Sequence, residues 1–361
     1  MQNNKLVSIV LPTFNGEKWI KKSIFSILNQ TYKNLEVLIV NDASTDQTPK
    51  IINSIEQLDN RITIINHMVN KKLPTSLNDG FKRANGEYLT WTSDDNWYDE
   101  TAVENLVNFL DNNPKIDMVS SNYRLVENEK IQDNIITKTD AEALINGNTI
   151  GACFLYRRSI AKVVGEYDPS MFLVEDYDYW LRILLKGKIG HLNKILYNYR
   201  LHKNSLSNTR RLEIKYKELL LKQKYYNEIS FAFPECTLNE LKRFVNYSKA
   251  IDNLINKIQK YFSLKPIYIY GSGFLCYLIL KKIDNLKKNK IVISGIFDTS
   301  AKNGEFYKYG YCIKYLQQNN IAKNSVIVIA SDKYRSEISN NIKKFMADQN
   351  VNIKVIELDF E

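Results

Sequence analysis

The first hundred residues alternate short apolar runs with segments of helical periodicity. Four runs rich in β-branched and aromatic residues predict strands, at residues 7–11, 35–40, 62–65 and 88–91. Three segments between them repeat apolar residues at helical spacing and predict helices, at residues 17–29, 48–57 and 76–84. This β-α-β spacing predicts an α/β fold with a doubly wound sheet that is parallel in this part of the chain.

The pattern changes after this region and indicates more than one domain. The last strand of the first pattern is expected at residues 194–199. Residues 203–225 then hold seven Lys or Arg and two Glu, which predicts an amphipathic basic helix. A new alternation of strands and helices begins at Lys265–Pro266. We therefore expect a first domain at residues 1–207, a helical linker at 208–264 and a small α/β domain at 265–361.

Polar side chains follow the predicted strands of the first domain at the points where ligands bind such sheets. Asn15, Asp42, Asp94 and Asp95 all lie just after a strand. Two adjacent carboxylates at a strand end are suited to Mg²⁺ or Mn²⁺, which prefer oxygen ligands and take few from the protein. The alternative for Asp94 and Asp95 is a loop that only caps the next helix, near Thr101.

A second candidate is the carboxylate of Asp42, which follows the apolar strand at residues 35–40. A carboxylate held there can accept the imide or amino hydrogens of a nucleobase. The alternative role is the N-cap of the helix at residues 48–57, although Thr45 or Asp46 would serve it better.

Two further clusters carry candidate chemistry. Glu175, Asp176 and Asp178 place three carboxylates within four residues at a predicted helix start, which is more than capping requires. One of them is a candidate general base for an acceptor hydroxyl. Arg200 and His202 close the last strand, where they are candidates to hold a diphosphate and to ligate a metal. The alternative for His202 is an ordinary polar surface residue.

In their order along the chain, these segments resemble glycosyltransferase family 2, whose fold is the GT-A type with a doubly wound mixed sheet. The resemblance covers about residues 5–207 and rests on six blocks: Val7–Gly16, Ser26–Tyr32, Val40–Asp46, Gly86–Asp95, Val174–Asp178 and Tyr199–His202. The chain departs from the family in having Asn41 before Asp42, and Thr92 two residues before Asp94, where the family often has Asp.

The resemblance implies a role for each residue of these blocks. Pro12, Thr13, Phe14, Asn15 and Asp42 would bind the nucleobase and ribose of a nucleotide-sugar donor. Asp94 would face the ribose or the metal, Asp95 would ligate Mn²⁺ or Mg²⁺, and Arg200 and His202 would meet the diphosphate or the metal. Asp176 would be the catalytic base, with Glu175 orienting it and Asp178 on the substrate side. The implied reaction is a single, inverting displacement at the anomeric carbon, with a glycan or lipid-linked glycan as acceptor, in bacterial surface polysaccharide synthesis.

The composition of the chain limits the kinds of partner and the cellular location that are expected. The net charge is +10, which favours anions such as nucleotides and phospholipid headgroups. No nucleic-acid-binding motif is present, so nucleic acid is not expected as a partner. No apolar run reaches the roughly 20 residues of a membrane span, so a cytoplasmic protein is expected, with at most a peripheral contact at the inner face of the membrane. Homo-oligomerisation is left open. The four cysteines lie far apart and predict reduced thiols.

The last hundred residues raise a separate question. Gly271-Ser272-Gly273 follows a predicted strand and opens a helix, which resembles a Rossmann-type arrangement. Cys276 stands where the dinucleotide fingerprint has its third glycine, which weakens that interpretation. A packing or oligomerisation module is therefore favoured over nucleotide binding. Three other functions remain as alternatives: a non-catalytic sugar-nucleotide or glycan-binding module, a sugar-nucleotide oxidoreductase acting through this segment, and a nucleotidyltransferase, whose glycine-rich signature is not found near the N-terminus.

Overall fold

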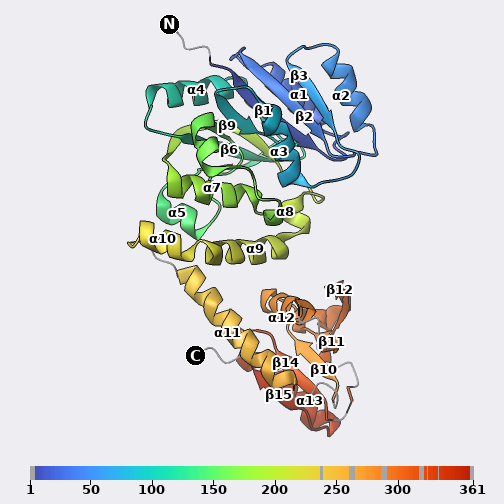
Figure 1. The fold of residues 1–361 in the computed structure, drawn as a ribbon. Coiled ribbons are helices and arrows are strands. Elements are labelled where there is room, and N and C mark those ends of the chain that lie inside the picture. The colour runs from blue at the N-terminus through green and yellow to red at the C-terminus, as the bar shows by residue number, and fades with distance from the viewer. Residues whose placement is uncertain are drawn as a thin grey trace. The chain divides into compact units, whose positions relative to one another are not determined.

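The computed structural model describes residues 5–235, 239–259, 265–285, 291–316, 321–322, 324–331 and 333–357. The chain forms two compact units, Met1–Leu238 and Asn239–Glu361. In Figure 1 the first unit runs from blue to yellow and the second from orange to red. The predicted segment 208–264 contributes residues to both units, and the two domain boundaries proposed from the sequence stay predictions.

The first unit is built on one mixed sheet with the strand order β3-β2-β1-β4-β8-β6-β9-β5. Its first part is parallel and consists of β1 (Val7–Thr13), β2 (Leu35–Asn41), β3 (Ile62–Asn66) and β4 (Tyr88–Trp91). Every residue of β1 is buried, because helices cover both faces of this part of the sheet. The predicted strands and the α/β class are confirmed.

The second half of the sheet contains the antiparallel pairings. It consists of β5 (Trp97–Tyr98), β6 (Met118–Glu127), β7 (Lys130–Ile135), β8 (Phe154–Arg157) and β9 (Ile189–Arg200). β8 runs antiparallel to both β4 and β6, whereas β6 and β9 are parallel. The residue pattern did not predict β5, β7 or β8: β5 and β8 are very short, and β7 is almost wholly exposed, so it lacks an apolar face.

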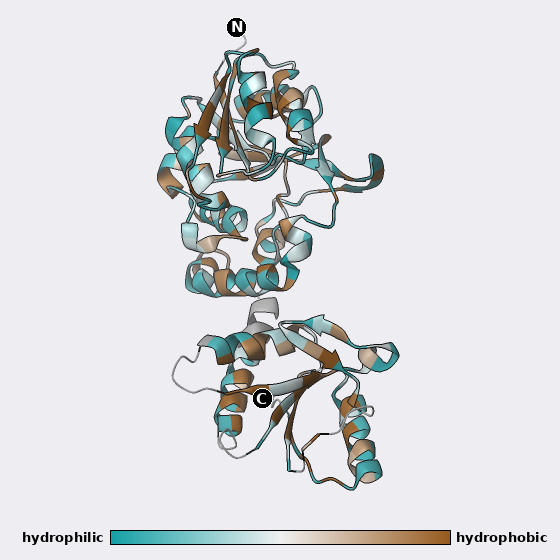
Figure 2. Cartoon of the chain, turned by 90° about the vertical axis from the view of Figure 1, so that its right-hand side faces the viewer, coloured by the Kyte–Doolittle hydropathy of each residue, from teal (hydrophilic) through white to brown (hydrophobic). Residues whose placement is uncertain are grey.

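Two apolar cores lie on opposite faces of this sheet. On one face pack α1 (Ile20–Leu28), α2 (Thr48–Glu56) and α4 (Ala102–Asn112). On the other pack α3 (Leu73–Arg83), α5 (Ala141–Asn146), α6 (Arg158–Val164) and α7 (Glu175–Lys186). The second core extends to α9 (Arg211–Lys224) and α10 (Tyr226–Ala232), which follow the short α8 (Leu206–Thr209). The strands are strongly apolar in Figure 2, while the helices are amphipathic, as this two-sided packing requires.

The second unit has a six-stranded sheet with the order β12-β13-β11-β10-β14-β15. Its strands are β10 (Ile267–Tyr270), β11 (Ile293–Phe297), β12 (Phe306–Lys308), β13 (Tyr311–Lys314), β14 (Val326–Ile329) and β15 (Lys354–Glu357). The helices are α11 (Asn239–Gln259), α12 (Phe274–Asn285) and α13 (Arg335–Gln349). All pairings are parallel except that of β12 with β13, and the order on either side of β10 is the Rossmann-like one.

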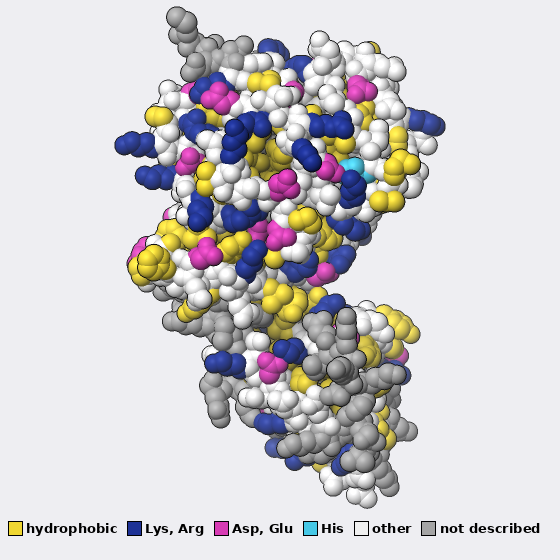
Figure 3. Space-filling view, in the orientation of Figure 1, with side chains coloured by type: hydrophobic (Ala, Val, Ile, Leu, Met, Phe, Trp, Pro, Cys, Tyr) yellow, Lys and Arg dark blue, Asp and Glu magenta, His cyan; other side chains and the backbone are white. Residues whose placement is uncertain are grey.

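Two sequence expectations concern single features. Cys153, Cys276 and Cys312 are free thiols, and Cys236 lies outside the described residues. None of the described helices combines the length and the apolar character that a bilayer span requires. Figure 3 shows Lys and Arg side chains spread over the visible face of the first unit and mixed with acidic ones, without the single basic stripe that is typical of a nucleic-acid site.

Candidate active site

The loops after β1, β2 and β4 meet at one edge of the first sheet. The Thr13 hydroxyl donates a hydrogen bond to Asp94 Oδ2 at 2.5 Å, and the Asp42 amide donates to the Thr13 carbonyl at 2.8 Å. Gly16 is required there, since a Cβ at this position would lie 2.3 Å from Asp94 Oδ2. Three segments that are far apart in the sequence are thus joined where a parallel sheet offers its ligand site.

Asn15 and Phe14 complete this edge. The Asn15 amide donates to Ser44 Oγ at 2.9 Å, and Asn15 Oδ1 accepts from the Thr45 amide at 2.8 Å. Asn15 therefore ties the loop after β1 to the loop after β2. The Phe14 ring beside it is 49% exposed and is available to a ligand, although Pro12 is buried within β1.

Backbone strain is concentrated around the same edge. Four non-glycine residues with positive φ lie here: Asn15 at 56°, Ala43 at 62°, Lys72 at 73° and Leu173 at 83°. The first three lie in the loops that follow β1, β2 and β3, and Leu173 lies two residues before α7. Such conformations cost of order 1–3 kcal/mol each and are typical of functional sites.

Asp94 and Asp95 form the acidic centre of the site. Burial and the neighbouring charge of Asp95 raise the pKa of Asp94 to about 7. Asp95 Oδ2 lies 2.9 Å from His202 Nε2, and Asp95 Oδ1 accepts from Ser93 Oγ at 2.7 Å. The end of β9 is therefore attached to the loop after β4, and this brings the predicted metal residues together.

These side chains fit a divalent cation that completes its coordination with oxygens of a substrate. Burial and the charge of Asp95 raise the pKa of Asp94 and so disfavour its charged form, which a bound cation would favour. Mg²⁺ and Mn²⁺ often take only one or two protein carboxylates together with phosphate oxygens. Over the described part of the chain, no group of three or more His, Cys, Asp or Glu is arranged to hold a metal alone.

Arg200 lies beside this centre and already has several partners. Its guanidinium lies over the rings of Trp97 and Trp19, 4.7 and 5.3 Å from their centroids, and its Nε donates to the Asp95 carbonyl at 3.0 Å. It also forms an ion pair with Glu129, which lies in the turn between β6 and β7. A diphosphate at Arg200 would therefore share it with Glu129 or displace Glu129.

Glu129 is held by a second cation as well. Lys22 Nζ lies 2.6 Å from the Glu129 carboxylate and 3.5 Å from the centroid of the Trp97 ring. Hydrogen bonds from Lys22 and Arg200 lower the pKa of Glu129 to about 2. The turn at Asn128 and Glu129, where both φ angles are positive, thus places an anion next to two cations of the site.

Glu175 and Asp176 open α7, but their environments differ. Burial and the charge of Asp176 raise the pKa of Glu175 to about 8, and Glu175 Oε2 has no hydrogen-bond partner among the described residues. Asp176 is less buried and accepts hydrogen bonds from Asn148 Nδ2 at 2.8 Å and from the Tyr177 amide at 2.7 Å. Burial also raises the pKa of Asp176, which makes it a better base than an exposed aspartate.

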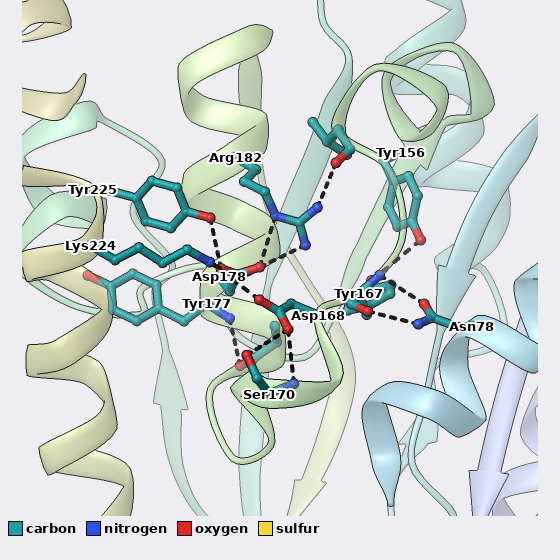
Figure 4. A network of polar contacts seen from close by, with 12 residues as sticks. Asn78, Tyr156, Tyr167, Asp168, Ser170, Tyr177, Asp178, Arg182, Lys224 and Tyr225 are labelled. Carbon is teal, nitrogen blue, oxygen red and sulfur yellow. Dashed lines mark hydrogen bonds and ion pairs between the residues drawn. The ribbon is translucent and has the colours of Figure 1, made fainter. Parts of the chain in front are cut away.

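Asp178 lies apart from these two carboxylates. It is fully buried, and its oxygens are taken by Arg182 at 2.7 Å, Tyr225 at 2.9 Å and Lys224 at 3.3 Å. Figure 4 shows these three side chains converging on Asp178 from α7 and α9 and from the junction with α10. The structure thus places Asp178, predicted as a substrate residue, in a network that joins helices.

Several residues of this region are not indicated by the sequence patterns. Trp19 packs against His202 with their ring centroids 4.4 Å apart and their planes tilted by 52°, and Glu129 pairs with Arg200. His67, which directly follows β3, contacts Asp42. The rule that singled out Asp42 and Asp94, a polar residue at a strand end, would also have selected His67. No local pattern marks Trp19 or Glu129.

Comparison with known proteins agrees with this geometry. The family model described as Glycosyl transferase family 2 matches residues 8–165. An uncharacterized glycosyltransferase of Haemophilus influenzae is 31% identical over 224 residues, which cover 57% of this chain and 69% of that protein. The matched region therefore contains the loops after β1, β2 and β4.

Two solved structures are similar in fold. TarS of S. aureus in complex with UDP has a TM-score of 0.51 and 18% identity, covering 85% of this chain and 95% of that chain. The mannosyltransferase PcManGT of Pyrobaculum calidifontis, in complex with GDP-Man and Mn²⁺, has a TM-score of 0.50 and 14% identity, covering 78% and 80%. At these identities the likeness concerns the fold alone, which is the expected GT-A type. The chain belongs to glycosyltransferase family 2 and is a bacterial glycosyltransferase.

Proposed function

We propose that this enzyme transfers a sugar from a UDP-sugar to a hydroxyl of a glycan acceptor, with inversion at the anomeric carbon. The observation that carries the proposal is the connection of Thr13, Asp94, Asp95 and His202 at one edge of the sheet. It joins a nucleotide-side segment to an acidic pair that suits a cation and a diphosphate. The complexes of TarS with UDP and of PcManGT with GDP-Man support a nucleoside-diphosphate donor.

The donor's base and ribose are assigned to the loops after β1 and β2. Phe14 offers an exposed ring for stacking, and Asp42 offers an acceptor for a base N–H. Pro12, Thr13 and Asn15 shape the same loop. A uridine fits this carboxylate because its ring N3–H can donate a hydrogen bond to it.

The residues that would hold a divalent metal, Mn²⁺ or Mg²⁺, are Asp95 and Asp94 with His202. When bound, the metal would supply positive charge for the leaving diphosphate. Arg200 and Lys22 add two cations at the same place, although Glu129 pairs with both. The Mn²⁺ in the PcManGT complex supports this assignment.

Asp176 is the proposed catalytic base. It takes the proton from the acceptor hydroxyl while that oxygen attacks the anomeric carbon and the bond to the diphosphate oxygen breaks. A carboxyl with a pKa of about 8 keeps its proton at pH 7, so Glu175 leaves the negative charge to Asp176. Glu175 thereby orients Asp176 without repelling it. Asp178 is proposed to act only through the packing of α7.

The remaining proposals concern the cell and the chain as a whole. The acceptor is proposed to be a glycan or lipid-linked glycan of a bacterial surface polysaccharide, reached in the cytoplasm or at the inner face of the membrane. The net charge of +10 supports contact with anionic headgroups. Residues 1–207 are the proposed catalytic domain, 208–264 the linker and 265–361 a packing or oligomerisation domain.

A donor screen tests the proposed function. The purified chain is mixed with UDP-, GDP-, CDP- and dTDP-sugars, and the release of free nucleoside diphosphate is measured with Mn²⁺, with Mg²⁺ and with EDTA. We expect slow hydrolysis of a UDP-sugar that needs the metal. Release from none of the donors, or undiminished release in EDTA, contradicts the proposal.

A further inference from the structure

His67 lies behind the proposed base-binding carboxylate and has no role in the function proposed above. Its side chain is 3% exposed, and its Nδ1 lies 2.8 Å from Asp42 Oδ1. On the other side of the ring, Nε2 lies 3.0 Å from Asp79 Oδ2. The imidazole therefore lies between the loop after β2 and helix α3, hydrogen-bonded to Asp42 and within ion-pair distance of Asp79 without a hydrogen bond to it.

Asp42 receives two more donors from the backbone. The Lys71 amide donates to Oδ1 at 2.8 Å and the Lys72 amide donates to Oδ2 at 2.9 Å. Lys72 adopts a φ of 73° to do so, which is a strained conformation for a residue with a side chain. With the proton of His67 on Nδ1, the tautomer that a carboxylate partner favours, three of the roughly four acceptor positions of Asp42 are occupied, and one is left for a ligand.

The charged groups around His67 explain how the ring affects the orientation of the Asp42 carboxylate. The groups that face it are Asp42 from the β2 end and Asp79 from α3, and Lys71 Nζ lies 3.0 Å from the same Asp79 oxygen. Without the ring, the buried Asp42 would keep only its two backbone donors, whereas Asp79, which is partly exposed, would keep Lys71. A buried carboxylate that loses a donor turns toward other partners or toward solvent.

We propose that His67 is a positioning residue that sets the base preference of the donor site, by fixing Asp42 with one acceptor position toward the base. This inference rests on the proposed function, in which Asp42 faces the base. An ionised carboxylate with one free acceptor position can accept a hydrogen bond from the N3–H group of uracil. It repels the unprotonated N3 of cytosine, because that nitrogen is itself an acceptor. The selected donor class is therefore uridine nucleotides over cytidine nucleotides.

Two substitutions whose side chains differ only in length distinguish a positioning role of His67 from a packing role. In His67→Asn the side-chain amide nitrogen comes close to the place of Nδ1 and can still donate to Asp42. In His67→Gln the amide nitrogen comes close to the place of Nε2 and faces Asp79 instead. Both introduce the same carboxamide, so they serve as matched controls for each other.

The measurement is calorimetric titration of the full chain with UDP and with CDP, with thermal unfolding of each variant. We expect the wild type and His67→Asn to prefer UDP by about tenfold or more, the value of one well-made hydrogen bond to a charged group. His67→Gln should lose about tenfold in UDP affinity and much less in CDP affinity. A His67→Gln variant that keeps the wild-type preference overturns the inference, as does equal loss of both nucleotides.

A second measurement holds even if His67→Gln does not fold. The wild type is titrated with UDP methylated at N3, in which the ring N–H is absent. We expect this analogue to bind at least about tenfold more weakly than UDP, and equal binding overturns the inference. If the wild type binds UDP but substitution of His67 does not change the preference for UDP over CDP, only this inference is contradicted. If the wild type binds no nucleoside diphosphate, the proposed function is contradicted as well.

Discussion

His202 Nε2 lies 2.9 Å from Asp95 Oδ2, although the two residues are 107 positions apart in the sequence. This contact closes the candidate site, because it attaches the end of β9 to the loop after β4. The His202 ring is supported from behind by Trp19. The acidic centre therefore depends on the antiparallel half of the sheet as well as on the nucleotide-side strands.

The first prediction concerns the acidic pair. Asp95→Ala should lower transfer at least about a hundredfold, because the charge that stabilises the leaving diphosphate is worth several kcal/mol. Initial rates with a UDP-sugar, measured over a range of Mn²⁺ concentrations, test this. Asp133→Ala on exposed β7 is the control and should behave as the wild type. Full activity of Asp95→Ala would refute the role of Asp95.

The second prediction concerns donor binding. Asp42→Ala should weaken UDP binding about tenfold, since it removes the acceptor proposed for the base N–H. It also frees His67 and the amides of Lys71 and Lys72, so the melting temperature must be measured beside the calorimetric titration. GDP binding more tightly than UDP to the wild type would show that the base is not the predicted one.

The third prediction concerns the catalytic base. Asp176→Asn should bind UDP nearly as the wild type does but transfer the sugar at least about a hundredfold more slowly, because a base acts in the transition state. Glu175→Gln should be milder, since Glu175 only orients Asp176. Single-turnover transfer and donor binding are measured for both variants. If Glu175→Gln lowered the transfer rate more than Asp176→Asn did, Glu175 would be the base and Asp176 the orienting residue.

The fourth prediction concerns Asp178. Asp178→Asn should lower the free energy of unfolding by about 3 kcal/mol, the lower end for breaking a buried ion pair, because Arg182 and Lys224 stay partly open to solvent. Chemical denaturation with urea measures this. At temperatures where the variant is folded, its turnover should stay within a few-fold of the wild type. A variant that is as stable as the wild type but inactive would support a substrate-side role for Asp178 instead.

The fifth prediction concerns pH. Burial and Asp176 raise the pKa of Glu175 from 4.5 to about 8, so the folded state binds more protons than the unfolded state between these values. Stability contributed by this group must then fall as the pH rises from about 5 to 8, by the linkage relation. Glu175→Gln cannot ionise, so its melting temperature should decline less over this range. Parallel curves for the two proteins would contradict the buried, protonated state.

The sequence alone was sufficient for the parallel half of the first sheet. Strands such as β1 and β2, which are buried on both faces, are short apolar runs that end at polar residues, and this pattern is local. For the same reason Asp42, Asp94 and Asp95 could be selected as strand-end candidates. The ordered blocks then implied the family and the GT-A fold before any contact was known.

The tertiary structure alone decided which partner each of these side chains has. Arg200 lies against Trp97, Trp19 and Glu129, and Asp178 is bonded to Arg182 and Tyr225, and none of these partners is indicated by a local pattern. Glu129 lies in the turn that leads into the edge strand β7. This strand has no apolar face, so its sequence lacks the alternation of apolar and polar residues that predicts a strand. Residue spacing determines which face of an element a side chain occupies, but its partner depends on which distant element packs against that face.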